Sequence, residues 1–524
     1  MLKIVIRNAA SNWLGYAVNA VVGFFLTPFV LATLGDAGYG IWALVIGLTG
    51  YYGLLDLGLR AGITQTMTLD LARKDYAALN RNASTALLVM SLCGAGILVA
   101  SLPAAWVAPR LFKIPEELVV TTRACMLIVG LSVALQFVAF PFSAAFAAAQ
   151  RYDVSNLIGV STRLLTAAAS VAVLGAGLGL VGLAAATAAV NILDYAIRWR
   201  VAHRIIPELA ASFRTANRAS VRVLGAYSGW NVLIAASQQL VYYSGAMIIG
   251  IFMPVAAVAP FQLAGGVVQQ LLGLIAPLVV VLFPAFAHLN LRDDQKAFRS
   301  VFLSVSRWLS LVALTAGVVS FLWADDFFHL WLGADYGKIS DYPAVALLYR
   351  ILLVGAVATA GARAANQVLL ALNRMGTITA ISASEAAACL LACVVLVPWW
   401  GLIGAALALT VPPIVVRCVI QPAIVTRIAH FRLGEYVFHT FLRPTLFGML
   451  LTGLLLACRA VLPPADTWTR LVCAGLVGGA IALPVGLLVG IEGHEQARFR
   501  RLLIGWRRPV ISLPRGANVP EQRE

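Results

Sequence analysis

Residues 38–62 read GYGIWALVIGLTGYYGLLDLGLRAG, an apolar run that ends with two opposite charges. About 20 apolar residues are enough for a helix to cross a lipid bilayer, so this stretch predicts a membrane span. Asp56 and Arg60 lie four residues apart on one helix face, where they can pair. A membrane helix keeps such a face only where it meets protein or water. The stretch therefore predicts a helix bundle in which this pair has either a structural or a substrate-facing role.

The composition of the whole chain agrees with this interpretation. Of its 524 residues, 61% are hydrophobic and only 11% are charged, whereas soluble domains carry about 25% charged residues. We therefore predict an all-α polytopic membrane protein with about 14 transmembrane helices and no sizeable soluble domain. The predicted spans are residues 9–34, 38–62, 83–108, 118–146, 157–177, 180–199, 223–252, 257–287, 301–324, 344–370, 377–398, 401–426, 442–461 and 469–491.

Basic residues are distributed unevenly between the loops. One set of loops and the C-terminal tail carry most of the Lys and Arg, including Arg73, Lys74 and Arg214, whereas the opposite set collects acids such as Glu116 and Asp325. Because basic loops stay in the cytoplasm, both termini are expected there. The net charge of +16 is mostly this topology signal. The basic tail is expected to attract anionic lipid, and no nucleic-acid partner is expected.

Two short motifs recur along the chain. Ala149-Gln-Arg-Tyr152 follows the fourth span and Leu372-Asn-Arg-Met375 follows the tenth, a displacement of 223 residues from Arg151 to Arg374. Gly179-Leu-Val-Gly182 matches Gly401-Leu-Ile-Gly404 at a displacement of 222. Spans 1–6 (the first repeat) and spans 7–12 (the second repeat) are thus predicted to be two pseudo-symmetric six-helix lobes with a substrate path between them. The expected division is an N-terminal lobe with its linker at 1–222, a C-terminal lobe at 223–430, two extra helices at 431–491 and a basic cytoplasmic tail at 492–524.

Polar side chains concentrate in the spans that begin each repeat. Asn19 lies on a polar face of span 1 and Tyr52 in span 2, while Gln238, Tyr242 and Gln269 lie in spans 7 and 8. Hydrogen bonding between helices explains any one of these residues. The cluster as a whole favours a hydrated central cavity.

Charged side chains inside the other predicted spans are mostly Arg. Each costs at least ~2.5 kcal/mol at the centre of a membrane helix, and pairing with the few acids cannot neutralise them all. Guanidinium groups suit bidentate recognition of phosphate, so an anion is expected among them. For the one carboxylate, both a pair with Arg163 across the repeats and a proton-carrying role are open. These residues are Arg123, Arg163, Arg307, Arg350, Arg363, Arg417 and Glu385.

Motifs of common enzymes and of metal sites are missing from the sequence. It has no GxxxxGK[ST] phosphate-binding loop, no HExxH and no clustered His. Its seven Cys lie in or beside apolar runs, which is typical of small buried hydrophobes. We therefore expect no enzyme activity, no cofactor and no metal.

Several stretches together resemble one known family. They are the Asn12-Trp13 opening, Leu34-Gly-Asp-Ala-Gly-Tyr-Gly-Ile-Trp42, Leu55-Asp-Leu-Gly-Leu59, Gln150-Arg-Tyr-Asp153, Asn373-Arg374, the two glycine motifs above and Trp331-Leu-Gly-Ala-Asp-Tyr336. With them the chain resembles the polysaccharide flippases, the translocases of O-antigen and exopolysaccharide repeat units. That family belongs to the multidrug/oligosaccharidyl-lipid/polysaccharide exporter superfamily.

This resemblance implies a function. The chain is expected to flip undecaprenyl-pyrophosphate-linked oligosaccharide to the outer leaflet of the bacterial inner membrane by alternating access, for lipopolysaccharide or exopolysaccharide biosynthesis. An isolated ion in hydrocarbon costs tens of kcal/mol, so a cationic lumen is expected. We assign Arg60, Arg123, Arg350 and Arg363 to the pyrophosphate, Asn19, Tyr52, Gln238, Tyr242 and Gln269 to the glycan, and Asp56 and Glu385 to a coupling ion.

The resemblance also implies partners, and other functions remain open. Membrane lipids and the polymerase and glycosyltransferases of the same pathway are the expected partners of a protein that works as a monomer. One alternative is a multidrug antiporter of the same superfamily, which would need acidic residues to attract organic cations. Another is an integral-membrane glycosyl- or acyltransferase, which would need acidic or His catalytic groups. A third is a non-transporting scaffold in a polysaccharide assembly complex.

Overall fold

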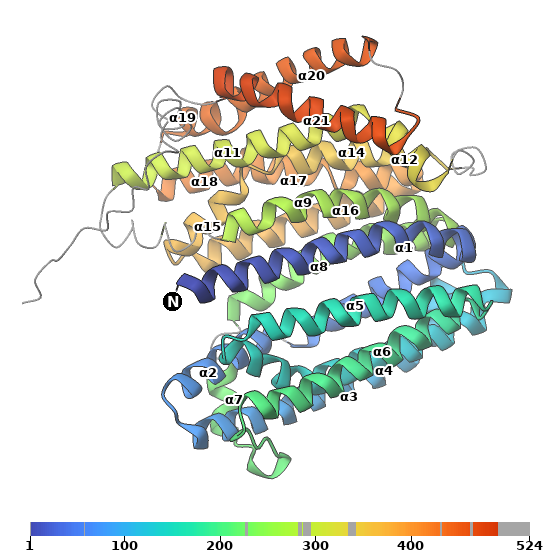
Figure 1. The fold of residues 1–524 in the computed structure, drawn as a ribbon, viewed down its shortest axis with the longest axis vertical. Coiled ribbons are helices and arrows are strands. Elements are labelled where there is room, and N and C mark those ends of the chain that lie inside the picture. Colours follow the sequence, from blue (N-terminus) through green and yellow to red (C-terminus); the bar gives the residue numbers. More distant parts are fainter. Residues whose placement is uncertain are drawn as a thin grey trace, which may run out of the picture.

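The computed structural model describes residues 2–56, 58–225, 229–280, 286, 295–333, 342–429, 432–461 and 465–490, and it is helical throughout (Figure 1). Within these ranges there is no β-strand. Twelve helical segments in this part of the chain are long and apolar enough to cross a membrane. The predicted all-α polytopic membrane fold is therefore confirmed.

Two of the twelve segments are too long for a single crossing. The first, Trp13–Leu55, has 43 residues and the other, Met375–Ile428, has 54, whereas a crossing takes about 20. Each contains a glycine with a positive φ, 68° at Gly35 and 55° at Gly401, a backbone conformation that glycine adopts without strain. A Cβ added at Gly404 would overlap the carbonyl oxygen of Leu396, so the chain folds back at Gly401. Each long segment thus accounts for two of the predicted spans.

The helices of the first repeat form the lower part of the molecule in Figure 1. The strongest packing joins α3 to α4, α4 to α6, and α5 to both α6 and α1. The chain then continues through a linker toward the second repeat. The elements are α1 (Leu2–Tyr51), η1 (Tyr52–Asp56), α2 (Leu59–Ala72), α3 (Tyr76–Leu111), α4 (Glu116–Ala148), α5 (Tyr152–Gly175), α6 (Gly179–Ile205), η2 (Phe213–Thr215) and α7 (Arg218–Gly225).

The helices of the second repeat lie above them, with α16 packed on α8 and α14 on α9. Both α1 and α8 run side by side through the middle of the molecule (Figure 1). The elements are α8 (Gly229–Phe252), η3 (Val255–Ala257), α9 (Val258–Val280), α11 (Gln295–Leu322), α12 (Ala324–Leu332), α14 (Val345–Ala358), α15 (Arg363–Ala371), α16 (Met375–Ala408), α17 (Val411–Val415), the π-helical turn η4 (Val416–Ile420) and α18 (Gln421–Ile428).

The remaining helices pack on α11 at the edge of the second repeat. Phe447, Leu451 and Leu455 of α20 are each at most 1% exposed and form a separate core with residues of α11 and α21. These helices are α19 (Leu433–Val437), the π-helical turn η5 (Phe438–Leu442), α20 (Arg443–Val461), α21 (Trp468–Val485) and the π-helical turn η6 (Gly486–Gly490). The basic tail, 492–524, lies outside the described residues.

The two copies of the first recurring motif have the same backbone. Gln150 and Asn373 both have φ 56°. In each copy the next amide N–H reaches back five residues, from Arg151 to the Phe146 carbonyl and from Arg374 to the Leu369 carbonyl, at 2.8 Å in both. This is a common way to end a helix, with one residue in the left-handed region. The match supports the internal repeat, while the division into two moving lobes stays a prediction.

The two repeats meet along α1 and α8. A Cβ added at Gly40 would overlap the Val255 carbonyl oxygen of η3, so the backbones touch there. Farther along, the rings of Tyr51 and Tyr243 lie 5.5 Å apart. Lys113 Nζ, in the turn between α3 and α4, donates a hydrogen bond to the carbonyl of Phe252 at 2.7 Å. Because Phe252 ends α8, this contact joins a turn of the first repeat to a helix of the second.

Candidate functional site

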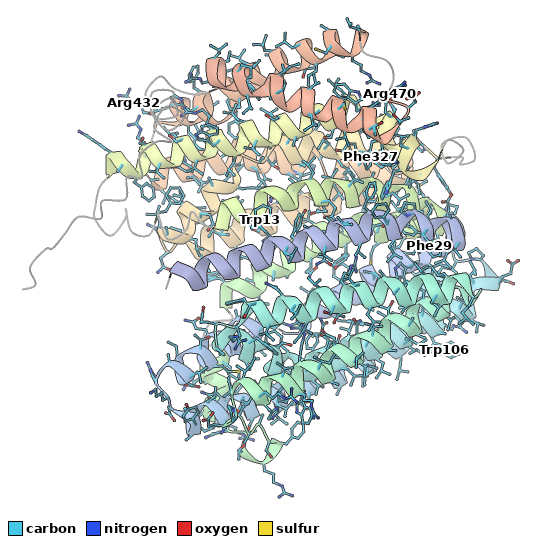
Figure 2. All side chains as sticks on the ribbon, viewed as in Figure 1. Trp13, Phe29, Trp106, Phe327, Arg432 and Arg470 are labelled. Carbon is cyan, nitrogen blue, oxygen red and sulfur yellow. The ribbon has the colours of Figure 1, made fainter. Side chains whose placement is uncertain are left out.

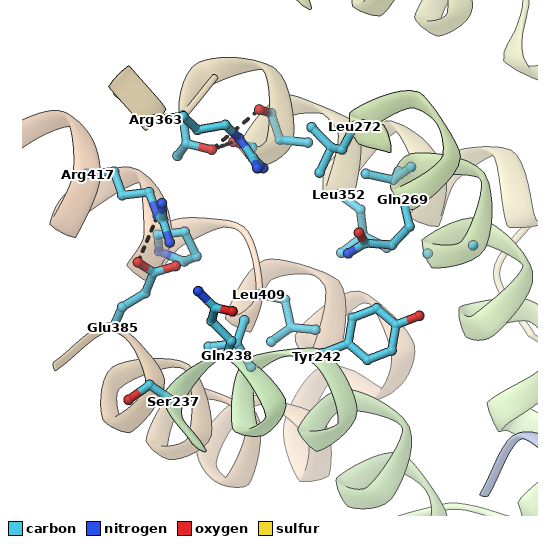
Figure 3. Close-up of a pocket in the computed structure, with 18 of the residues that line it drawn as sticks. Ser237, Gln238, Tyr242, Gln269, Leu272, Leu352, Arg363, Glu385, Leu409 and Arg417 are labelled. Carbon is cyan, nitrogen blue, oxygen red and sulfur yellow. Dashed lines mark hydrogen bonds and ion pairs between the residues drawn. The ribbon is translucent and has the colours of Figure 1, made fainter. Parts of the chain in front are cut away.

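A cavity of about 290 Å³ lies among α8, α9, α14, α15, α16, α17 and η4 (Figure 3). All the residues that line it belong to the second repeat. The sequence predicted a central cavity lined by both repeats, and this one is built by the second repeat alone. Its polar and charged lining residues are Ser237, Gln238, Tyr242, Gln262, Gln269, Thr359, Arg363, Ser382, Glu385 and Arg417.

A break in the tenth span brings Arg363 to the cavity. The helix α14 ends at Ala358 and α15 begins at Arg363, with a turn between them. A Cβ added at Gly361 would overlap the Ser310 hydroxyl of α11, so only glycine allows the turn to pack this closely. The break places a guanidinium on the first residue of a new helix, the end where the helix dipole favours an anion.

Arg363 points into the cavity in Figure 3. Its Nε is buried and has no hydrogen-bond partner among the described residues. A buried guanidinium without a partner is costly, and an anion in the cavity would offset that cost. Asn366, one turn later, is engaged elsewhere, because its Oδ1 accepts a hydrogen bond from Gln421 Nε2 at 2.8 Å.

Glu385 and Arg417 form an ion pair on another side of the cavity, with 2.8 Å between Arg417 Nε and Glu385 Oε2. The side chain of Glu385 is 6% exposed and that of Arg417 is 23% exposed. The two residues face each other because the chain reverses at Gly401, midway between them. The alternative of a Glu385–Arg163 pair is therefore wrong. With Arg363, the cavity holds two guanidinium groups and one carboxylate, so its charge is positive.

Neutral hydrogen-bonding groups occupy the opposite side of the cavity. Gln238 and Tyr242 come from α8 and Gln269 from α9 (Figure 3), and Gln262 adds a further amide. The structure thus brings three of the predicted glycan residues together with Arg363 and Glu385. Two lining residues, Gln262 and Arg417, were not assigned to the site from the sequence. Equal spacing on either side of Gly401 is the signal that would have found Arg417.

The other three predicted pyrophosphate residues lie outside this cavity. Arg60 lies over the rings of Phe137 and Phe140, 4.7 and 5.0 Å from their centroids. Arg123 stacks on Trp106 at 4.1 Å, and Trp106 lies at the edge of the first repeat in Figure 2. Arg350 pairs through both terminal nitrogens with the carboxylate of Asp325, at 3.2 and 2.6 Å. Each guanidinium therefore has its own contact, and their role in binding stays a prediction.

Two predicted glycan residues also lie outside the cavity. Asn19 Nδ2 donates to the Gly15 carbonyl of its own helix at 3.0 Å. The Tyr52 hydroxyl accepts a hydrogen bond from Ser101 Oγ of α3 at 3.0 Å. The side chain of Asp56, a predicted coupling residue, lies outside the described residues. The assignments of these three residues stay predictions.

The fold defines a class of membrane transporter. The chain is similar to a solved lipid II flippase, MurJ, in an inward closed conformation, with a TM-score of 0.72 and 11% identity over 95% of this chain and 100% of MurJ. It is also similar to an inward-facing multidrug transporter of the MATE family in the MOP superfamily, with a TM-score of 0.67 and 12% identity over 80% of this chain and 98% of the other. At these identities the likeness establishes the fold.

The family follows from the sequence match. Residues 30–341 match the family described as "Polysaccharide biosynthesis protein", and the chain belongs to that family. An 89-residue stretch is 27% identical to a putative O-antigen transporter from Shigella flexneri, over 17% of this chain and 21% of the relative. The match thus spans about a fifth of that relative's length. The predicted resemblance to the polysaccharide flippases of the exporter superfamily is confirmed.

Proposed function

We propose that this protein flips a polyprenyl-diphosphate-linked oligosaccharide from the cytoplasmic to the outer leaflet of the inner membrane by alternating access. The observation that carries the proposal is the positive cavity of the second repeat. Arg363 has no ion-pair partner among the described residues, and Arg417 uses Nε for Glu385. An entering diphosphate would bind these two guanidinium groups, which offer paired N–H donors at a spacing that suits phosphate oxygens.

The amide side of the cavity supports a glycan next to the anion. Gln238, Gln262 and Gln269 each offer a donor and an acceptor, as a sugar hydroxyl does. At about 290 Å³, the cavity is at the small end of the range for ligand sites, so it holds only the part of the substrate next to the lipid. The longer glycan would occupy the space between the repeats, where Asn19 and Tyr52 are proposed to meet it.

The rest of the proposal extends this site. Both termini lie in the cytoplasm, and the two repeats rock about the α1–α8 contact as lobes. Glu385 and Asp56 are the carboxylates proposed for a coupling ion. Membrane lipids, the polymerase and the glycosyltransferases of the same pathway are the proposed partners of a monomer. The multidrug antiporter is disfavoured because an organic cation would enter a cavity that already carries surplus positive charge.

A translocation assay with purified protein in proteoliposomes tests the proposal. The probe is a fluorescent lipid-linked oligosaccharide, and its arrival in the far leaflet is measured. Arg363→Ala is expected to slow flipping by at least about tenfold, because a charged hydrogen bond contributes roughly 1.5–3 kcal/mol. Arg363→Lys keeps the charge but loses the bidentate geometry, so it should retain part of the activity.

A matched control comes from the same segment of chain. Arg374 is exposed in the loop after α15 and does not line the cavity. Arg374→Ala should therefore flip substrate at the rate of the unchanged protein. Equal rates for Arg363→Ala and Arg374→Ala would remove the cavity from the mechanism.

A further inference from the structure

The linker that joins the two repeats is folded back against the first one. Asn80 of α3 donates to the Glu208 carbonyl at 2.8 Å and accepts from the Ala210 amide at 2.7 Å. The Ser212 amide donates to Ser84 Oγ at 2.9 Å, and the Asn217 amide donates to Thr85 Oγ1 at 3.0 Å. Residues 208–217 are therefore fixed along the first turns of α3.

The short helix α7 continues this fixed arrangement. The Asn217 side chain caps it by accepting from the Ala219 amide at 3.0 Å. Leu224 is 1% exposed, and a Cβ added at Gly62 of α2 would overlap its carbonyl oxygen. One face of α7 is thus held against α2, beside which it lies in Figure 1. The other face, with Arg218 and Arg222, is exposed.

The exposed side chains of this region form what we call the basic platform. They come from the α2–α3 turn, the start of α3, the end of α6, the linker and α7. Asp75 and Glu208 are the exposed acids in the same segments, so the surface has a large positive surplus. The platform consists of Arg73, Lys74, Arg81, Arg204, Arg214, Arg218 and Arg222.

Exposed apolar side chains lie among these charges. Phe213 is 56% exposed, Val221 is 42% exposed and Tyr76 is 36% exposed. Trp199, at 51%, lies one turn before Arg204 on α6. Aromatic rings interleaved with Lys and Arg are typical of segments that rest at the boundary between water and hydrocarbon. Membrane topology accounts for the sign of the charge, but it does not require a rigid backbone or interleaved rings.

We propose that the basic platform binds the headgroups of anionic phospholipids. Seven cations held at fixed positions repel one another, and lipid phosphates would offset that repulsion. Polybasic segments next to membrane spans gain affinity for anionic lipid with each Lys or Arg. Phe213 and Val221 would rest among the upper parts of the acyl chains. Lipid binding here anchors the first repeat, to which the linker is bonded, and leaves the second repeat free of this contact.

Photo-crosslinking of lipids to the full chain tests the proposal. The protein is placed in nanodiscs of phosphatidylcholine and phosphatidylglycerol, with a photoactivatable trace of one lipid or the other. Mass spectrometry then maps the labelled peptides. Residues 199–222 should carry several-fold more phosphatidylglycerol label than phosphatidylcholine label, and the difference should shrink as salt is raised.

The variants make the outcome decisive. The triple variant R214Q/R218Q/R222Q should lose phosphatidylglycerol label at 199–222 by about tenfold or more, since each charge contributes separately. These side chains are exposed, so thermal unfolding should be unchanged. The control R374Q removes an exposed Arg of the second repeat and should leave the labelling intact. Equal labelling by the two lipids, or full labelling of the triple variant, would overturn the proposal.

Discussion

The same two positions of the repeat carry opposite chemistry in the two halves of the molecule. In the second repeat, Glu385 pairs with Arg417 across the cavity. At the displacement of 223 residues, their counterparts are Thr162 and Asp194, and Thr162 Oγ1 donates to Asp194 Oδ1 at 2.7 Å. Asp194 also pairs with Arg198 of its own helix at 2.7 Å. Both repeats keep a polar contact between the matching spans.

The comparison extends to the residue that carries the proposed function. By the same displacement, the counterpart of Arg363 is Phe140, whose ring lies under Arg60 at 5.0 Å. Where the second repeat presents a cation to a cavity, the first fills the equivalent place with an aromatic ring. The difference teaches that one scaffold serves two roles. The repeat fixes where helices turn and pair, and single substitutions decide which half binds an anion.

The largest expected effect comes from reversing the charge that distinguishes the halves. Arg363→Glu should abolish flipping in the proteoliposome assay, since a diphosphate would then meet a carboxylate. Adding Phe140→Arg to this variant should not restore transport, because the first repeat lacks the surrounding amide groups. Recovery in the double variant would show that the two halves are interchangeable and that the asymmetry has no functional weight.

Breaking the matching polar contacts should separate the halves by stability. Glu385→Ala leaves a largely buried guanidinium alone and should lower the free energy of unfolding by about 3 kcal/mol. Thr162→Val should cost only about 1 kcal/mol, because Asp194 keeps Arg198. Denaturant unfolding in detergent measures both. Similar losses would mean that Glu385–Arg417 is solvated like a surface pair.

The smallest expected effect is the one on which the two halves should agree. Asn373→Val and Gln150→Val both place a β-branched residue at φ 56°. Each should lower the free energy of unfolding by about 1–2 kcal/mol, the cost of the left-handed conformation. The same denaturant series measures them, with Arg374→Ala as a neutral reference. A clear difference between the two variants would show that the loops differ in their surroundings despite sharing a backbone.

Local patterns in the sequence were enough to predict the spans and the matching loops. Apolar length determines a membrane crossing, and the recurring Arg151 and Arg374 motifs give the register of the repeat. The division of labour between the halves was not accessible in this way. Arg350 pairs with Asp325 of α12, and Arg60 stacks on rings of α4. Such contacts depend on packing between helices, which spacing along one helix does not encode.

The cavity was predicted only in part for the same reason. Arg363, Glu385, Gln238, Tyr242 and Gln269 were selected because they are polar groups within apolar spans. Their enclosure by a single repeat depends on the break before α15 and on the reversal at Gly401. The sequence marks both places with glycine, but their geometry follows from contacts with α11 and η3.

The contact of Gly40 with the Val255 carbonyl leaves no clearance for even a methyl group. A single added carbon would act there as a wedge between the halves. The resting balance between the open and shut forms thus hangs on the smallest residue of the chain. Variation at position 40 would shift that balance long before it disturbed the bundle itself.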